Sequence, residues 1–419
     1  PCNISFMKKV LEAQKLELDL QVGALAHKFD GAGYKFYLVG GVVRDLLLGK
    51  LNNDIDVTTD AEPDVIVKLV TGWADAIWDQ GAKFGTIGIR KNSQIIEITT
   101  HRSENYVSNS RKPSVQFSQV IEDDLSRRDF TVNSIAIKIP EWELIDPFGG
   151  QLDLERKVLR TPLDPEVSFS DDPLRMLRAA RFMAGYQLVP GVDLMDAVER
   201  LRDRISIVSK ERVIEELKKL LKVENPTKGL LFLEQTGLLG LVIEGYDGVV
   251  SVPELAVNDI SDELSLSWAT LLYPIVTSGE QARVLLVDMR ASNNLAKKVG
   301  RVIEATHQIS SIDEASEPNV RRILFFWGDE FPEALAVLKV FKKNPSQNLL
   351  GVFTQIIESE GNRGAQSPLD GNEIMGIVGD GPIVGRAINF LNALILEVGL
   401  MSREEAIKAV EDWSSSSKN

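Results

Sequence analysis

The chain has 419 residues, 44% hydrophobic and 26% charged, a composition that excludes collagen-like and intrinsically disordered proteins. No run approaches the ~18 consecutive apolar residues of a membrane helix and no secretory segment opens the chain, so we expect a cytoplasmic protein with no membrane partner and no obligate protein partner. The net charge of −14 disfavours nonspecific binding of long nucleic acids, but local basic clusters are compatible with the binding of a small structured RNA.

The first 150 residues mix strand and helix patterns. We predict strands at 34–39, 54–58 and 94–100, helices at 42–48 and 61–78, and a strand, or a helix start leading into one, at 131–139. From about residue 171 onward the strand patterns fade. There we predict helices at 210–222, 226–236, 264–276, 280–290, 294–311, 318–327, 331–341, 346–358, 382–398 and 403–413.

These patterns predict an α+β fold in which a mixed head precedes helical parts. We expect the head at 1–150, a neck at 151–225, a body at 226–345, and a tail at 346–419 with a disordered polar end from Ser414. The single cysteine, Cys2, excludes an intrachain disulfide and a cysteine-built zinc site.

Two glycines, Gly40 and Gly41, lie between a predicted strand and a predicted helix that carries Arg44. Glycines allow a ligand to approach the backbone closely, and the amides of a helix start favour an anion, so the turn suits a triphosphate. Alternatively, it is a simple connection between strand and helix.

Asp54 and Asp56 occupy alternate positions of a predicted strand, so both carboxylates share one face while Ile55 points into the core. Two carboxylates at this spacing can hold a pair of Mg²⁺ ions, which activate a hydroxyl and stabilise a pyrophosphate leaving group. The alternative is a solvated strand edge with two acids.

Five stretches, in order, resemble the class II tRNA nucleotidyltransferase and bacterial poly(A) polymerase family. They are Leu38–Gly49, Asp54–Asp56, Arg127–Ala136, Asp146–Gly150 and Asp171–Phe182. The chain departs from the family at Ser134, where alanine is usual, and at Asp171, where glutamate is more common. Weaker similarity to the family's neck and tail continues at 228–239 and 381–385, so the resemblance covers nearly the whole chain.

The resemblance implies a polymerase-β-like head that adds nucleotides from CTP and ATP to tRNA, with Asp54 and Asp56 as catalytic residues and ligands of two Mg²⁺ ions. It implies that Asp129 contacts the ribose and that Asp172 with Arg175, three apart on an expected helix, reads the base edge. The full nucleotide-binding set is Gly40, Gly41, Arg44, Asp45, Arg128, Asp129, Asn133, Asp172, Arg175, Arg178 and Arg181.

Some of these residues have a second interpretation. Arg127 to Asp129 alternatively form a surface ion-pair run, and Arg181, predicted opposite Asp172 on the helix, is alternatively a packing or tethering residue. Glu97 is either a third catalytic carboxylate or a member of a strand-edge ion pair. The helical parts are expected to bind the acceptor stem and elbow of tRNA.

The family resemblance leaves three activities open: full CCA addition, partial addition (CC only, A only or poly(A)), and silent tRNA binding. A polar segment at 101–113, with Arg102, Arg111 and Lys112, fits the family's flexible loop and favours CCA or A addition, although Arg111 and Lys112 are alternatively a solvated turn. Tyr273-Pro274 stands where a His-Asp phosphohydrolase motif would fall, so we expect that activity to be absent.

Overall fold

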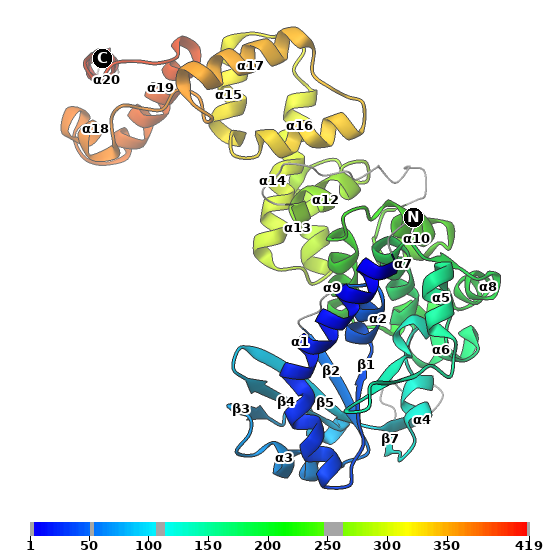
Figure 1. Cartoon of the computed structure of the whole chain (residues 1–419). Helices are drawn as coiled ribbons and strands as arrows, with labels where there is room; N and C mark the ends of the chain where they lie inside the picture. The colour runs from blue at the N-terminus through cyan, green and yellow to red at the C-terminus, as the bar shows by residue number, and fades with distance from the viewer. Residues whose placement is uncertain (1–3, 51–53, 106–113, 247–262, 417–419) are drawn as a thin grey trace. The chain divides into compact units, whose positions relative to one another are not determined.

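The computed structural model describes residues 4–50, 54–105, 114–246 and 263–416 (Figure 1). By its internal contacts the chain forms two compact units, one of residues 1–223 with 228–242 and one of residues 224–227 with 243–419. The first unit contains a mixed sheet with helices, and the described part of the second is helical. The predicted α+β fold is confirmed, whereas the four-part domain division remains a prediction.

A seven-stranded sheet organises the first unit. Across the sheet the strands are β3 (Ala76–Trp78), β4 (Thr86–Lys91), β5 (Gln94–Thr100), β2 (Ile55–Thr59), β1 (Phe36–Val39), β8 (Ala136–Lys138) and β9 (Glu143–Ile145). Only the β2–β5 pair is parallel. In that register Asp56 lies opposite Glu97, so two carboxylates are neighbours on adjacent strands.

The two faces of the sheet are buried by different helices. Residues Ile55 and Val57 of β2 pack in a core with α1 (Ile4–Gly31), α2 (Gly41–Leu47) and α3 (Pro63–Val70), and Figure 1 shows α1 lying along the sheet. On the other face, α4 (Ile121–Ser126) packs against β1 and β8. Because side chains alternate along a strand, Asp56 points away from the α1 side, and Asp54 lies just before the first residue of β2.

Ten further helices, three of them 3-10 helices, belong to the described part of the first unit. They are η1 (Ala82–Phe84), η2 (Thr131–Asn133), α5 (Gly150–Arg156), α6 (Pro165–Asp171), α7 (Leu174–Tyr186), α8 (Val192–Leu201), η3 (Arg202–Ile207), α9 (Lys210–Leu221), α10 (Thr227–Gln235) and α11 (Leu238–Val242). Two further strand pairs are β6 (Arg102–Asn105) with β7 (Ser114–Phe117), and β10 (Val158–Leu159) with β11 (Val189–Pro190). Helix α7 packs on α9, and this pair carries many of the site's charged side chains.

The described part of the second unit is built of helices. They are α12 (Glu263–Leu272), α13 (Gly279–Asp288), α14 (Asn293–Ser310), α15 (Glu317–Trp327), α16 (Phe331–Val340), α17 (Gln347–Glu360), α18 (Gly371–Val378), α19 (Pro382–Val398) and α20 (Arg403–Ser416). A buried ion pair of Arg321 with Glu360, at 2.8 Å, ties α15 to α17. Among the described helices, none alone is long and apolar enough to cross a membrane. The pair α18 and α19, bent by 114°, meets the requirements for a membrane span by length and composition only.

Most predicted elements are present, but three expectations are wrong. The helix expected at 61–78 ends at Val70, because Gly72 takes a positive φ and the chain then returns as β3. The segment expected as a loop from residue 101 begins as strand β6, although 106–113 lie outside the described residues. The polar end is helical through Ser416, with 417–419 outside the described residues.

Candidate active site

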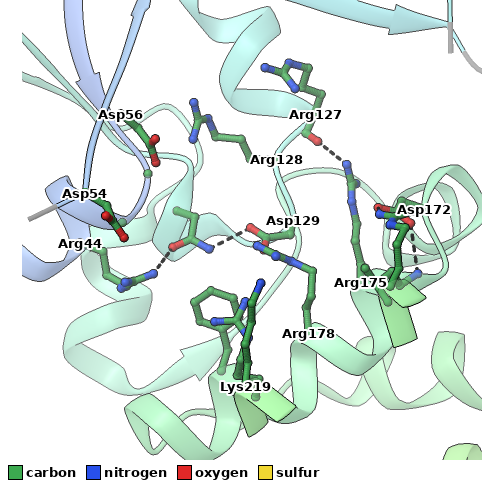
Figure 2. Close-up of a pocket in the computed structure, with 17 residues that line it drawn as sticks. Arg44, Asp54, Asp56, Arg127, Arg128, Asp129, Asp172, Arg175, Arg178 and Lys219 are labelled. Carbon is green, nitrogen blue, oxygen red and sulfur yellow. Dashed lines mark hydrogen bonds and ion pairs between the residues drawn. The ribbon is translucent and has the colours of Figure 1, made fainter. Parts of the chain in front are cut away.

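A cavity of about 560 Å³ on the second face of the sheet gathers most of the predicted site residues (Figure 2). Eight basic and four acidic side chains line it, so this pocket is cationic although the whole chain carries a charge of −14. The lining residues are Gly40, Gly41, Arg44, Asp54, Asp56, Arg127, Arg128, Asp129, Asn133, Asp172, Leu174, Arg175, Arg178, Arg181, Phe182, Arg212 and Lys219.

Asp54 and Asp56 form what we call the carboxylate end of the pocket, and Figure 2 shows them on the same side of β2, with Arg128 facing Asp56. Burial raises the pKa of the Asp56 carboxyl, and the negative charges of Glu97 and Asp54 raise it further against the opposing charge of Arg128. A cation at this end would therefore stabilise the ionised form of Asp56.

The carboxylates fit a divalent ion by their chemistry. Carboxylate oxygens are ligands that Mg²⁺ prefers, and such sites use one or two carboxylates together with substrate phosphates. Among the described residues no group of three or more His, Cys, Asp or Glu side chains is placed to hold a metal by itself. A divalent ion held by this pair would therefore also need oxygen ligands from phosphate or water.

The glycine turn forms the wall next to the carboxylate end. Gly40 has a φ of 73°, and a Cβ added to it would lie 2.8 Å from Nη1 of Arg128 and 3.7 Å from Oδ2 of Asp56. Any side chain here would strain the backbone and displace the Arg128 guanidinium. The sequence predicted that a ligand approaches this backbone closely; the structure places the Arg128 guanidinium beside it, and the approach of a ligand stays a prediction.

Arg44 reaches the pocket from α2 and is fixed on three sides. Its Nε donates to Oδ1 of Asp45 at 2.9 Å, its Nη1 donates to Oδ1 of Asn133 at 2.6 Å, and its guanidinium carbon lies 4.2 Å from the ring centroid of Tyr186. Only 6% of Arg44 is exposed. The position of this guanidinium at the pocket wall is therefore fixed by protein contacts.

Asp129 lies at the centre of the site, and its four acceptor positions are filled by protein donors. Oδ1 accepts from Phe130 N at 2.8 Å and from Asn133 Nδ2 at 2.9 Å, while Oδ2 accepts from Nε and Nη2 of Arg178. Burial acts to raise the pKa of Asp129, but Arg178 and Asn133 outweigh it and hold the pKa at about 2. A ribose contact at Asp129 therefore requires one of these donors to release it.

The expected placement of Asp172 on a helix is wrong. α6 ends at Asp171, Asp172 is extended with a φ of −139°, and its Oδ1 accepts from Leu174 N at 3.2 Å, because Pro173 begins a new helix. Its Oδ2 accepts from Arg212 Nη2 at 2.8 Å. Asp172 still lines the pocket, but from a loop.

Arg175 is fixed by oxygen atoms from two other segments. Its Nη1 donates to Ser168 Oγ at 2.8 Å and its Nη2 donates to the backbone carbonyl of Arg127, as Figure 2 shows. Only 8% of the residue is exposed. The geometry of this guanidinium therefore depends on where the backbone of Arg127 lies.

Arg178 and Arg181 line the same pocket, so the expectation that Arg181 lies opposite Asp172 on one helix is wrong, because Asp172 precedes α7. Glu216 of α9 binds both arginines, accepting from Arg178 Nη1 at 3.5 Å and Arg181 Nε at 2.9 Å. Arg181 thus tethers α7 to α9 and also faces the cavity. We call Asp172, Arg175, Arg178 and Arg181 the arginine end.

The remaining predicted residues lie outside the lining set. Asp45 accepts a hydrogen bond from Arg44, and Arg102 donates one to the carbonyl of Phe84. Glu97 is an exposed residue of β5, opposite Asp56 of β2. Arg111 and Lys112 fall outside the described residues. Glu97 as a third carboxylate stays a prediction.

Sequence reasoning missed several lining residues. Arg127 was noted only as part of a charged run, and Arg212 and Lys219 belong to the polar face of α9, about 40 residues beyond the arginine end. A basic stripe beside the apolar stripe of 210–222 is the only signal that could have suggested the last two. Their role depends on the packing of α7 against α9, which the sequence does not specify.

Two known protein families match segments of this chain. Residues 36–160 match the poly A polymerase head domain, and residues 193–247 match the probable RNA and SrmB-binding site of polymerase A. The chain is 30% identical to a CCA-adding enzyme of Bacillus pumilus over 70% of this chain and 73% of that protein. It is 27% identical to one of Leuconostoc mesenteroides over 91% of this chain and 93% of that protein.

Solved structures show the same fold. The CCA-adding enzyme of Bacillus stearothermophilus in complex with CTP superimposes with a TM-score of 0.75 at 24% identity, covering 96% of this chain and 98% of that one. The Thermotoga maritima CCA-adding enzyme complexed with tRNA has a TM-score of 0.63 at 22% identity, covering 97% and 98%. At these identities the likeness concerns the fold.

Proposed function

The chain belongs to the CCA-adding enzyme and poly(A) polymerase family of nucleotidyltransferases, and from this premise we propose that it adds C, C and A to the 3′ end of tRNA from CTP and ATP, without a nucleic-acid template, in tRNA maturation and repair. One observation carries the proposal: the carboxylate end and the arginine end line one cationic cavity. A pocket with these two ends can hold a nucleoside triphosphate by its phosphates and by its base.

We propose that Asp54 and Asp56 hold Mg²⁺ as a two-ion site. When bound, the ions supply charge stabilisation for the attacking 3′-hydroxyl and the pyrophosphate leaving group. The carboxylates orient the tRNA 3′ end toward the α-phosphate, and their placement at the start of β2 keeps that direction fixed. Burial raises the pKa of the Asp56 carboxyl, and bound cations would favour its ionised form.

Arg44 and Arg128, with the backbone at Gly40 and Gly41, are proposed to contact the triphosphate. Both guanidiniums are already anchored, Arg44 by Asp45 and Asn133 and Arg128 by Asp124, so little side-chain entropy is lost when phosphate binds. Asp129 is proposed to receive the ribose 2′-hydroxyl when Arg178 or Asn133 gives up one of its bonds.

At the arginine end, Asp172 accepts hydrogen bonds and Arg175 donates them. Cytosine and adenine both present an amino donor beside a ring-nitrogen acceptor, whereas uracil and guanine present the reverse pattern on the corresponding atoms. One acceptor with one donor therefore fits C and A and leaves unpaired groups against U and G. Arg178 and Arg181 are proposed to support the nucleotide from the same side.

The test uses tRNA transcripts ending at the discriminator base, at C and at CC. Each is incubated with Mg²⁺ and CTP, ATP or both, and the product 3′ ends are sequenced. Stepwise completion to CCA from the shortest transcript is the expected result. Stopping after CC, acting only on the CC-ended transcript, or continuing into poly(A) would each replace the proposal by a narrower activity of the same family.

No incorporation from any transcript, with tRNA still bound, would instead identify a silent tRNA-binding protein. The helical parts are proposed to bind the acceptor stem and elbow. Which of their residues contact tRNA can be mapped by nuclease protection of the bound transcript.

A further inference from the structure

One fully buried carboxylate lies behind the site and belongs to neither end of the pocket. Asp124 sits on the short helix α4, which covers the second face of the sheet, and none of its surface is exposed. An isolated buried carboxylate would be costly, so its ionic partners decide whether it is tolerated.

Asp124 binds two consecutive arginines, one with each oxygen. Oδ1 accepts from Nε and Nη2 of Arg127 at 3.1 and 2.6 Å, and Oδ2 accepts from Nη2 of Arg128 at 3.1 Å. Burial acts to raise the pKa of Asp124, but the two guanidiniums outweigh it, and the pKa lies below its usual range. The carboxylate is therefore ionised at neutral pH.

The two arginines make contacts at opposite ends of the pocket. Arg128 extends its Nη1 to the Gly40 turn beside Asp56, at the carboxylate end. Arg127 places its own backbone carbonyl, which accepts from Nη2 of Arg175, at the arginine end. Moving the Arg127 side chain would shift this carbonyl and with it the guanidinium that faces the base.

We propose that Asp124 is a positioning residue that sets the base choice of the enzyme by fixing Arg127, and through the Arg127 carbonyl Arg175, while holding Arg128 beside the catalytic carboxylates. This inference rests on the proposed nucleotidyl transfer and deepens it. Asp124 itself touches no substrate.

The test is Asp124→Asn, which keeps the shape of the side chain but removes its charge and places an amide donor against an arginine donor. The readout is the ratio of CTP to UTP incorporation on a transcript ending at the discriminator base. A partly unfolded enzyme lowers both rates by the same factor, so a purely structural defect leaves this ratio unchanged. We expect the ratio to fall about tenfold, as for residues that orient a ligand-binding group.

Asp123→Asn is the matched control, because Asp123 is a neighbouring carboxylate of the same helix that accepts from Ser118 Oγ at the exposed surface. It should retain the wild-type ratio. An unchanged ratio in Asp124→Asn, with wild-type enzyme active, would overturn the inference alone, whereas absence of incorporation by the wild-type enzyme would overturn the proposed function.

A second variant keeps the inference testable if Asp124→Asn does not fold. Arg127→Gln removes the other partner of the same contact, so the Arg127 backbone carbonyl is still present as an acceptor for Arg175 but is no longer anchored by Asp124. We expect it to lower the CTP to UTP ratio by a similar factor, and the double variant to lose no more than either single variant, because both break one connection. A wild-type ratio in Arg127→Gln, or losses that multiply in the double variant, would contradict the inference.

Discussion

The two ends of the pocket are positioned in different ways. At the carboxylate end, the alternation of side chains along one strand places Asp54 and Asp56. At the arginine end, Arg175, Arg178 and Arg181 are held by partners 35 to 49 residues away in sequence, and Arg175 also contacts the nearer Ser168. The first arrangement depends on backbone hydrogen bonds of a sheet. The second depends on side-chain ion pairs and one carbonyl. Under the proposed function, the carboxylate end would determine the rate and the arginine end, which is held by side-chain contacts, would determine the choice of base.

The largest effect is expected where the sheet places the carboxylates. Asp54→Ala should lower incorporation of both CTP and ATP by at least about a thousandfold, or about 4 kcal/mol in activation free energy, because it removes a proposed ligand of the ions. The affinity for tRNA should remain near that of the wild type, because phosphate contacts by Lys and Arg supply it. Single-turnover assays and filter binding measure the two quantities. A variant that still turns over at the wild-type rate would contradict the metal assignment.

The next effect tests the ion pairs that hold the arginine end. Glu216 has a side chain only 4% exposed and binds Arg178, Arg181 and Lys219. Glu216→Gln leaves Arg181 without its buried counter-charge and Arg178 with Asp129 alone, and the free energy of unfolding should fall by about 3 kcal/mol. Glu215→Gln, on the same helix but 59% exposed, should change it by less than about 1 kcal/mol. Urea unfolding of both variants makes the comparison; equal losses would argue against the buried network.

Arg175→Ala should change the choice of base more than the affinity for tRNA. Without the guanidinium, UTP and GTP no longer meet a mismatched donor, so the preference for CTP over UTP should fall about fiftyfold, or about 2.3 kcal/mol. Competitive incorporation followed by sequencing of the 3′ ends gives the ratio. Unchanged misincorporation of UTP and GTP would rule out the base-reading role.

The smallest expected effect is a pH dependence of stability that comes from His101. His101 is buried, its Nδ1 lies 2.8 Å from Thr58 Oγ1 on β2, and burial lowers its pKa to about 4. The unfolded chain binds a proton near the ordinary pKa of about 6.5, so stability is full above that pH and is lost as the pH falls toward 4. Between pH 7 and pH 5 this amounts to about 2 kcal/mol.

His101→Gln removes the titrating group while an amide can still bond to Thr58. The variant should therefore show a shallower loss of unfolding free energy between pH 7 and pH 5 than the wild type. Identical slopes in denaturant titrations at the two pH values would show that another group carries the pH dependence.

The sequence was sufficient to predict the carboxylate end, because strand alternation and a glycine turn are local properties of a few consecutive residues. It was sufficient to find the arginines but not their arrangement. Asp172 was expected on a helix with Arg175, yet Pro173 separates it from α7, so the helical spacing between Asp172 and the three arginines does not apply. The buried acids Asp124 and Glu216 gave no local signal, because their function depends on packing between distant elements.

The division between the two ends can be measured directly by comparing Asp56→Asn with Arg175→Lys in one assay that supplies all four nucleotides to a transcript ending at the discriminator base. The account predicts that Asp56→Asn lowers the rates for CTP and ATP together and leaves their preference over UTP and GTP intact. It predicts that Arg175→Lys retains more of the CTP rate but loses much of that preference. Loss of preference in Asp56→Asn, or a uniform loss of rate in Arg175→Lys, would contradict it.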